Sequence, residues 1–141
     1  DLTGRKLLMM QKGQIGPVLD MIQDFIDNSG AELAPQLQVY VDLWKETTEG
    51  VVDAAMKNPN EVGAASVDYL MMSGYVILAF FQAQLHNAAK QAKGQLGADF
   101  YQGKVKSAEF YFAKILPRCH SHKATIETGA APLMEINPAE F

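Results

Sequence analysis

The residues of this chain best suited to chemistry are the four consecutive residues Cys119, His120, Ser121 and His122. Cys119 and His122 are three positions apart, so on a helix they share a face and could point at one metal ion. A tetrahedral site needs further ligands, and the sequence contains no C-x-x-C, no H-E-x-x-H and no second Cys/His pair. A small thiol and a hydrogen-bonded imidazole are also ordinary on a packed helical face. We therefore expect no metal ligands here.

Other reactive arrangements have less support. A di-iron site in a helical bundle needs a glutamate three residues before each histidine, and those positions hold Ala83, Pro117 and Cys119. No serine lies in a G-x-S-x-G turn, and no glycine-rich loop could hold a phosphate. A hydrolase or transferase built on Cys119 with His86 as a remote base stays open as a minor alternative. We expect no catalytic, cofactor-binding or metal-binding residues in this segment.

The elements that would position these residues are helices. Apolar residues recur at the three-and-four spacing of a helical face, and this predicts four helices. The first ends near Asp27, and the other three span about residues 35–57, 61–93 and 99–128. The stop signals are Asn28-Ser29-Gly30, Asn58-Pro59-Asn60, Gly94 with Gly97, and Gly129, with Asp99 as the expected N-cap of the last helix.

The last two helices differ in their patterns. Residues 67–81 are apolar nearly all round, with Asp68 as the only charge, so this stretch is expected to be the most buried. The last helix carries a regular stripe that predicts a packing seam, and Pro117 interrupts it by removing one backbone donor. The stripe is Tyr101, Val105, Ala108, Phe112, Ile115, Cys119, His122 and Ile126.

These patterns predict an all-α protein, an antiparallel up-down four-helix bundle whose last helix is kinked at Pro117. We expect residues 1–11 to be a lead-in segment left from an upstream catalytic domain, residues 12–129 to be the bundle, and residues 130–141 to be a C-terminal tail. The chain starts at Asp1 rather than at a methionine, which indicates processing or a segment of a longer protein.

Composition limits the partners. The net charge is -4 and the 12 basic residues are scattered, which argues against nucleic acid and anionic membranes. The single cysteine, Cys119, is typical of a reducing compartment, and we expect a cytoplasmic protein. The apolar run 69–81 is shorter than the roughly 20 residues of a membrane span.

Three consecutive aromatic residues, Phe110, Tyr111 and Phe112, stand in the last helix. Consecutive residues project around more than half of a helix, so at least one should face something other than the domain's own core. Aromatic residues dominate cores, and core packing is the ordinary explanation for most of them. These three residues are nevertheless our candidate interface.

Several stretches of the chain resemble one known family. They are residues 1–7 (DLTGRKL), 100–104 (FYQGK), 108–112 (AEFYF) and 116–118 (LPR), and Gly129 followed by Leu133, Met134 and Phe141. They resemble the C-terminal-like domain appended to one branch of the acyl-CoA dehydrogenases, the 3-methylmercaptopropionyl-CoA dehydrogenase type. Residues 1–7 resemble the run with which the preceding flavin-binding helical domain of these enzymes ends.

The resemblance implies a non-catalytic domain of a larger oxidoreductase of fatty acid metabolism. The parent enzyme would bind FAD and introduce a double bond into an acyl-CoA, and its catalytic glutamate and flavin contacts would lie upstream of Asp1. The domain would pack on the catalytic domain of the same chain or mediate subunit contacts in a homo-oligomer. It would meet acyl-CoA only through the parent. The alternative is a free-standing helical module that binds an apolar ligand or a helical partner.

Overall fold

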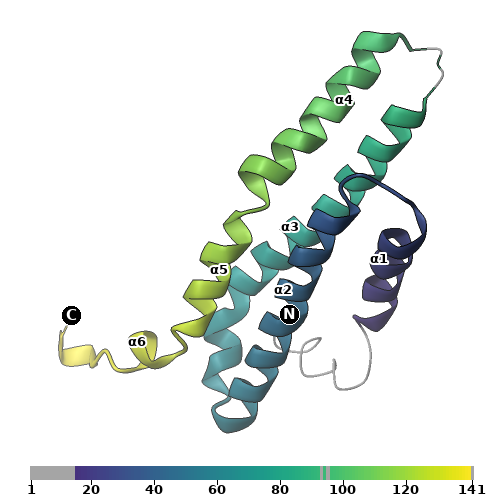
Figure 1. Ribbon diagram of the computed structural model, residues 1–141. Helices are drawn as coiled ribbons and strands as arrows, with labels where there is room; N and C mark the ends of the chain where they lie inside the picture. Colours follow the sequence, from purple (N-terminus) through teal and green to yellow (C-terminus); the bar gives the residue numbers. More distant parts are fainter. Residues whose placement is uncertain (1–14, 93, 95, 141) are drawn as a thin grey trace.

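The computed structural model describes residues 15–92, 94 and 96–140, and every regular element in these ranges is helical (Figure 1). The predicted all-α class is confirmed. The predicted lead-in segment, residues 1–11, lies outside the described residues. The elements are α1 (Gly16–Asn28), α2 (Ala34–Lys57), α3 (Asn60–Gln91), α4 (Ala98–Phe110), the π-helix η3 (Tyr111–Ile115), α5 (Arg118–Glu127), α6 (Ala131–Met134) and the 3₁₀-helix η4 (Pro138–Glu140).

The longest helix, α3, is the centre of the arrangement. It packs against α2 on one side and against α4 and α5 on another, as Figure 1 shows. The first helix, α1, has 13 residues against 24 in α2 and 32 in α3, and it packs mainly on α2. The Phe25 ring of α1 also reaches the Phe80 ring of α3, with ring centroids 5.5 Å apart. The short α1 therefore covers only part of the hairpin that α2 and α3 form.

The helix ends follow the expected local signals with one exception. Asn58 is extended before Pro59, and Gly30 has φ +61°, the left-handed conformation that a glycine stop requires. The expected N-cap at Asp99 is wrong: α4 begins at Ala98, its N-cap is Gly97, and Asp99 lies in the first turn. The reason is that Gly97 has φ +84°, so the chain turns into the helix before it reaches the aspartate.

The predicted last helix is divided into α4, η3 and α5. At the junction the Leu116 N–H donates to the carbonyl of Tyr111, five residues back, and the Cys119 N–H donates to the carbonyl of Leu116, three residues back. Pro117 has no N–H and crowds the carbonyl four residues before it, so the neighbouring bonds shift to these wider and narrower rings. Because of this wide turn, Leu116 reaches the core in addition to the stripe residue Phe112.

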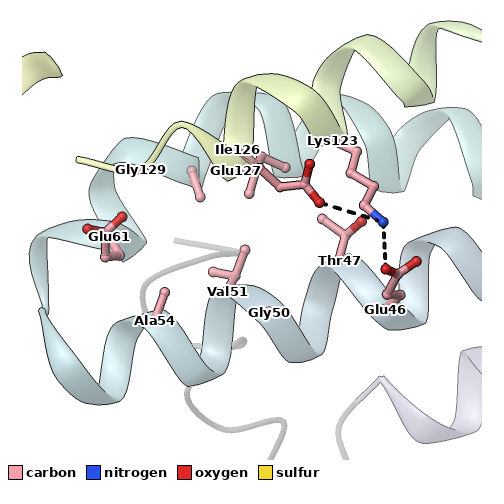
Figure 2. Close-up of a pocket in the computed structure, with 11 residues that line it drawn as sticks. Glu46, Thr47, Gly50, Val51, Ala54, Glu61, Lys123, Ile126, Glu127 and Gly129 are labelled. Atoms are coloured by element: carbon pink, nitrogen blue, oxygen red, sulfur yellow. Dashed lines mark ion pairs between the residues drawn. The ribbon is translucent and has the colours of Figure 1, made fainter. Parts of the chain in front are cut away.

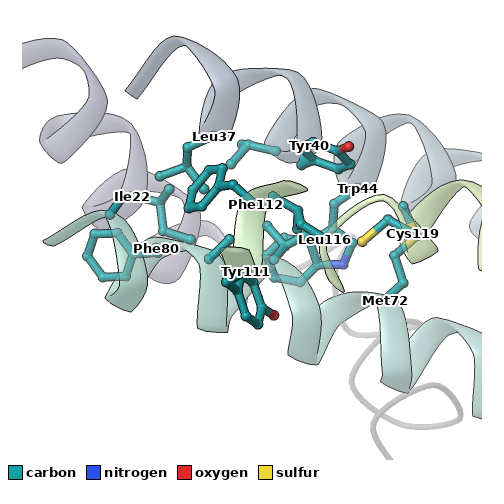
Figure 3. Close-up of a cluster of buried hydrophobic side chains, with 14 of the residues drawn as sticks. Ile22, Leu37, Tyr40, Trp44, Met72, Phe80, Tyr111, Phe112, Leu116 and Cys119 are labelled. Carbon is teal, nitrogen blue, oxygen red and sulfur yellow. The ribbon is translucent and has the colours of Figure 1, made fainter. Parts of the chain in front are cut away.

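The core lies between α2, α3 and the last helical run, with α1 closing one side (Figure 3). Tyr69, Met72 and Val76 of α3 are fully buried in it, together with Leu37 and Val41 of α2. Residues 67–81, which were expected to be the most buried stretch, are buried on one face, while Val67, Leu70, Met71, Leu78 and Phe81 are exposed. An all-round apolar helix is usually covered on every side, but α2, α4 and α5 leave one face of α3 uncovered.

By length and composition alone, α3 is the one helix among the described residues that could cross a membrane. The buried core helix of a packed protein passes the same test, and one face of α3 is core here. The finding is therefore weak support for a span.

Candidate interaction surface

The predicted interface residues are split between the surface and the core. The Phe110 side chain is 59% exposed, whereas Tyr111 is 7% and Phe112 is 2% exposed. The Tyr111 hydroxyl donates a hydrogen bond to the backbone carbonyl of Tyr75 on α3, at 3.0 Å. Tyr111 and Phe112 are therefore core residues, and Phe110 is the one of the three that is exposed to solvent. That it contacts a partner stays a prediction.

Cys119 and His122 do not form an open reactive site. Cys119 is fully buried, and burial raises the pKa of its thiol to about 12. The His122 Nδ1 lies 2.7 Å from a carboxylate oxygen of Asp68 on α3, and its ring lies against Tyr75 with centroids 5.6 Å apart. His120 is exposed beside the ring of Tyr40. These side chains therefore join α5 to α2 and α3.

The alternative that paired Cys119 with His86 is wrong. In the core, Cys119 lies beside Met72 (Figure 3), and α3 rises about 21 Å from Met72 to His86 at about 1.5 Å per residue. His86 is itself buried, and the nearest ionic group to it is the Glu109 carboxylate, 3.7 Å from Nε2. At a separation of about 20 Å along α3, His86 cannot take the proton of the Cys119 thiol. Across the described part of the chain, no group of three or more Cys, His, Asp or Glu side chains is placed to hold a metal ion.

A cleft of about 340 Å³ lies between α2, the start of α3 and α5 (Figure 2). Val51, Ala54 and Ile126 give it apolar walls. At one end, Lys123 forms ion pairs with Glu46 at 2.7 Å and with Glu127 at 3.6 Å, and the bond from Glu46 raises the pKa of the lysine.

At its other end the cleft is closed by a structural contact. The Glu61 carboxylate accepts hydrogen bonds from the backbone N–H of Ala130 at 2.9 Å and from the side-chain amide of Asn58 at 3.2 Å. The charged groups around the cleft are thus engaged with one another or with the backbone. The cleft has the size of a small ligand site. Among the described residues that line it there is no paired nucleophile and base, and no aromatic ring.

Within the described residues, one face of α3 is left uncovered by the other helices, and we call this face the α3 stripe. Its members are exposed, and three or four positions separate each from the next. This face could not be predicted from the sequence, because apolar residues occur nearly all round the helix. The α3 stripe consists of Gly63, Val67, Leu70, Gly74, Leu78, Phe81, Leu85 and Ala88.

Comparison with known proteins relates the chain to one family and to a longer relative. Residues 18–137 match the family described as acetyl-CoA dehydrogenase C-terminal like. The chain is 29% identical, over an aligned length of 157 residues, to the broad-specificity linear acyl-CoA dehydrogenase FadE5 of Mycobacterium tuberculosis. The alignment covers 100% of this chain and 26% of that protein. The chain therefore spans about a quarter of the length of the curated relative it matches.

Proposed function

Because the chain belongs to the acetyl-CoA dehydrogenase C-terminal-like family, we propose that it is the C-terminal helical domain of an FAD-dependent acyl-CoA dehydrogenase. The family match over residues 18–137 carries this proposal. The share of the relative that the chain covers, 26%, leaves ample length for a catalytic part elsewhere in the parent. That part would supply the FAD site and the base that removes a proton from the acyl-CoA.

The domain itself would act by packing, on the catalytic part of its own chain or on a second subunit. Two observations support this role. Cys119 and His86 are buried, and the His122 ring is bonded to the Asp68 carboxylate. A long apolar face is exposed, and such faces on globular proteins mark interaction sites.

We further propose the 3-methylmercaptopropionyl-CoA dehydrogenase-type branch for the parent, on the resemblance of residues 100–104 and 108–112. A cytoplasmic location and a homo-oligomeric parent are part of the same proposal. The single buried thiol, Cys119, fits a reducing compartment.

The test is to express this chain alone and joined to the polypeptide encoded upstream of Asp1. We expect the joined protein to be yellow from bound flavin and to oxidise an acyl-CoA with a dye as electron acceptor. The chain alone should be helical, colourless and inactive. Flavin or dehydrogenase activity in the chain alone, or an upstream sequence without a flavin-binding dehydrogenase domain, would overturn the proposal.

The apolar cleft between α2 and α5 favours a second candidate, a module that binds an apolar ligand. Native mass spectrometry of the purified chain distinguishes the two. A stoichiometric co-purified lipid or acyl chain, lost on the substitution Ala54→Trp in the cleft wall, would support the ligand-binding module. A bare polypeptide mass supports the structural domain.

A further inference from the structure

The α3 stripe has the form of a surface along which one helix can pack. From Val67 onward its members follow at steps of three and four, the spacing that places side chains in line along a helix packing against another helix. From Gly63 to Ala88 the stripe is about 37 Å long, at about 1.5 Å per residue. A Cβ atom added at Gly63 or Gly74 would meet nothing within 4 Å, so the helix backbone faces open space at both positions.

The charges along the stripe indicate whether a lipid surface or a protein helix covers it. From Val62 to Ala89 the only charged residue of α3 is Asp68, and its carboxylate is bonded to His122 rather than exposed on the stripe. An anionic lipid surface would need lysine or arginine residues flanking the apolar face. Between Val62 and Ala89, α3 itself carries neither, and the stripe therefore fits a protein helix that presents apolar side chains.

The size of the stripe indicates whether that helix belongs to a free partner or to the same polypeptide. A helix about 10 Å wide lying along it would cover a projected footprint of roughly 370 Å², whereas a stable interface between free partners buries about 800 Å² on each side. Partners in one polypeptide need less contact, because the linkage supplies a millimolar effective concentration. The relative that aligns with this whole chain is about four times as long, so such a linked partner is available in proteins of this kind.

We propose that the α3 stripe is the surface on which a helix from the upstream part of the same dehydrogenase polypeptide packs lengthwise. This inference rests on the proposed function and names its contact surface. It differs from the Phe110 candidate, which lies on α4.

The test compares two cysteine substitutions at equally exposed sites, Leu78→Cys in the stripe and Val39→Cys on α2, where the native side chains are 50% and 57% exposed. The native Cys119 is buried and does not compete for reagent. Each variant is made in the chain alone and in the chain joined to its upstream part, and the rate of maleimide labelling is measured. We expect the joined protein to label at least tenfold more slowly than the chain alone for Leu78→Cys, and at the same rate for Val39→Cys.

Each other outcome has a distinct meaning. If the joined protein binds flavin and oxidises acyl-CoA but Leu78→Cys labels at the rate of the chain alone, the inference is wrong and the proposed function stands. If the joined protein has neither property, the proposed function fails. Protection of Leu78→Cys in the chain alone that grows with protein concentration would show that a second copy covers the stripe. Protection by phosphatidylcholine–phosphatidylserine vesicles would show a lipid surface, and either result overturns the inference.

Discussion

Cys119 is the residue whose chemistry changes most between sequence and structure. As a lone thiol beside two histidines it is a candidate ligand or nucleophile, but in the fold it is fully buried in the core cluster that also holds Tyr40, Trp44 and Met72 (Figure 3). A thiolate in apolar surroundings is disfavoured, which is why the pKa of this thiol rises. The thiolate is the nucleophile of cysteine, so burial removes both access and reactivity.

We predict that Cys119 is unreactive in the native chain. At about pH 8, a disulfide reagent such as DTNB should label the native protein only as fast as it unfolds, and it should label one thiol per chain in denaturing urea. The single cysteine makes the stoichiometry unambiguous. Labelling of the native protein within seconds would show that the thiol is exposed or activated.

The neighbouring aromatics give a second prediction at this scale. Phe112 is 2% exposed in the core, and Phe112→Ala should lower the free energy of unfolding by about 3–5 kcal/mol because it leaves a cavity. Phe110→Ala should change it by no more than about 0.5 kcal/mol, because that ring contributes little to the core. Urea unfolding followed by circular dichroism measures both. Equal losses for the two variants would contradict the placement of these rings.

The aromatic triplet also shows what residue patterns can predict. That one ring must leave the core follows from helical geometry, since three consecutive residues cannot share a face. Val105 and Ala108 are buried, Phe112 continues their stripe, and Tyr111 lies three residues after Ala108, so Phe110 is the ring that leaves. The π-helix at Tyr111–Ile115 affects the residues after these rings: the Leu116 N–H donates to the Tyr111 carbonyl, and Leu116, which is not in the predicted stripe, is fully buried. A hydrogen-bond choice of this kind leaves no periodic signal in a sequence.

At the scale of the element, helix ends were more predictable than helix interiors. Pro59 and Gly30 act through their own backbone restrictions, so their effects can be read locally. The interior of α3 could not be assigned in this way. An apolar residue there has the same appearance whether it meets α2 or solvent, and only the number of packed neighbours distinguishes Tyr69 from Leu70.

The glycine that ends α5 allows an element-scale prediction. Gly129 has φ +72°, and an added Cβ would lie 3.0 Å from a carboxylate oxygen of Glu61, the group that holds the Ala130 N–H. Gly30 has a similar φ of +61° with nothing within 4 Å, so it is a matched control. Both alanine variants should lose about 1–2 kcal/mol to left-handed strain. Gly129→Ala should lose more, because it also displaces Glu61.

Thermal or urea unfolding of the two variants checks this difference. In a Glu61→Ala background, Gly129→Ala should cost only the left-handed strain, because the carboxylate that the methyl group crowds is then absent. If Gly30→Ala is as destabilising as Gly129→Ala, the Glu61 contact contributes nothing to the closure of α5.

At the scale of the whole molecule, the helical class follows from periodicity, but the uncovered face of α3 does not. Periodicity reports that a residue is apolar, while coverage depends on how many helices surround it. Here α1 is too short, and too far toward α2, to cover the α3 stripe. The assignment to the C-terminal-like domain of acyl-CoA dehydrogenases was expected from the resemblance of stretches such as residues 100–104 and 108–112, and the family match supports it.

The last prediction concerns the response of the whole fold to alkali. Burial raises the pKa of Cys119 from 9.0 to about 12, and it raises the pKa of Tyr40, Tyr69 and Tyr111 above 10.0. Above these ordinary values the unfolded chain releases protons that the folded chain retains. The unfolded state then binds fewer protons, so stability falls as pH rises.

The order of these groups makes the prediction specific. Between pH 9 and pH 10 the thiol is the group in this set that has begun to ionise in the unfolded chain, and the tyrosines follow above pH 10. The free energy of unfolding should therefore decline by up to about 1.4 kcal/mol per pH unit for one proton. Cys119→Ala should be less stable at neutral pH but should show a flatter profile in this window. Urea titrations at half-unit intervals measure both slopes, and parallel slopes for the two proteins would mean that Cys119 ionises as readily in the fold as outside it.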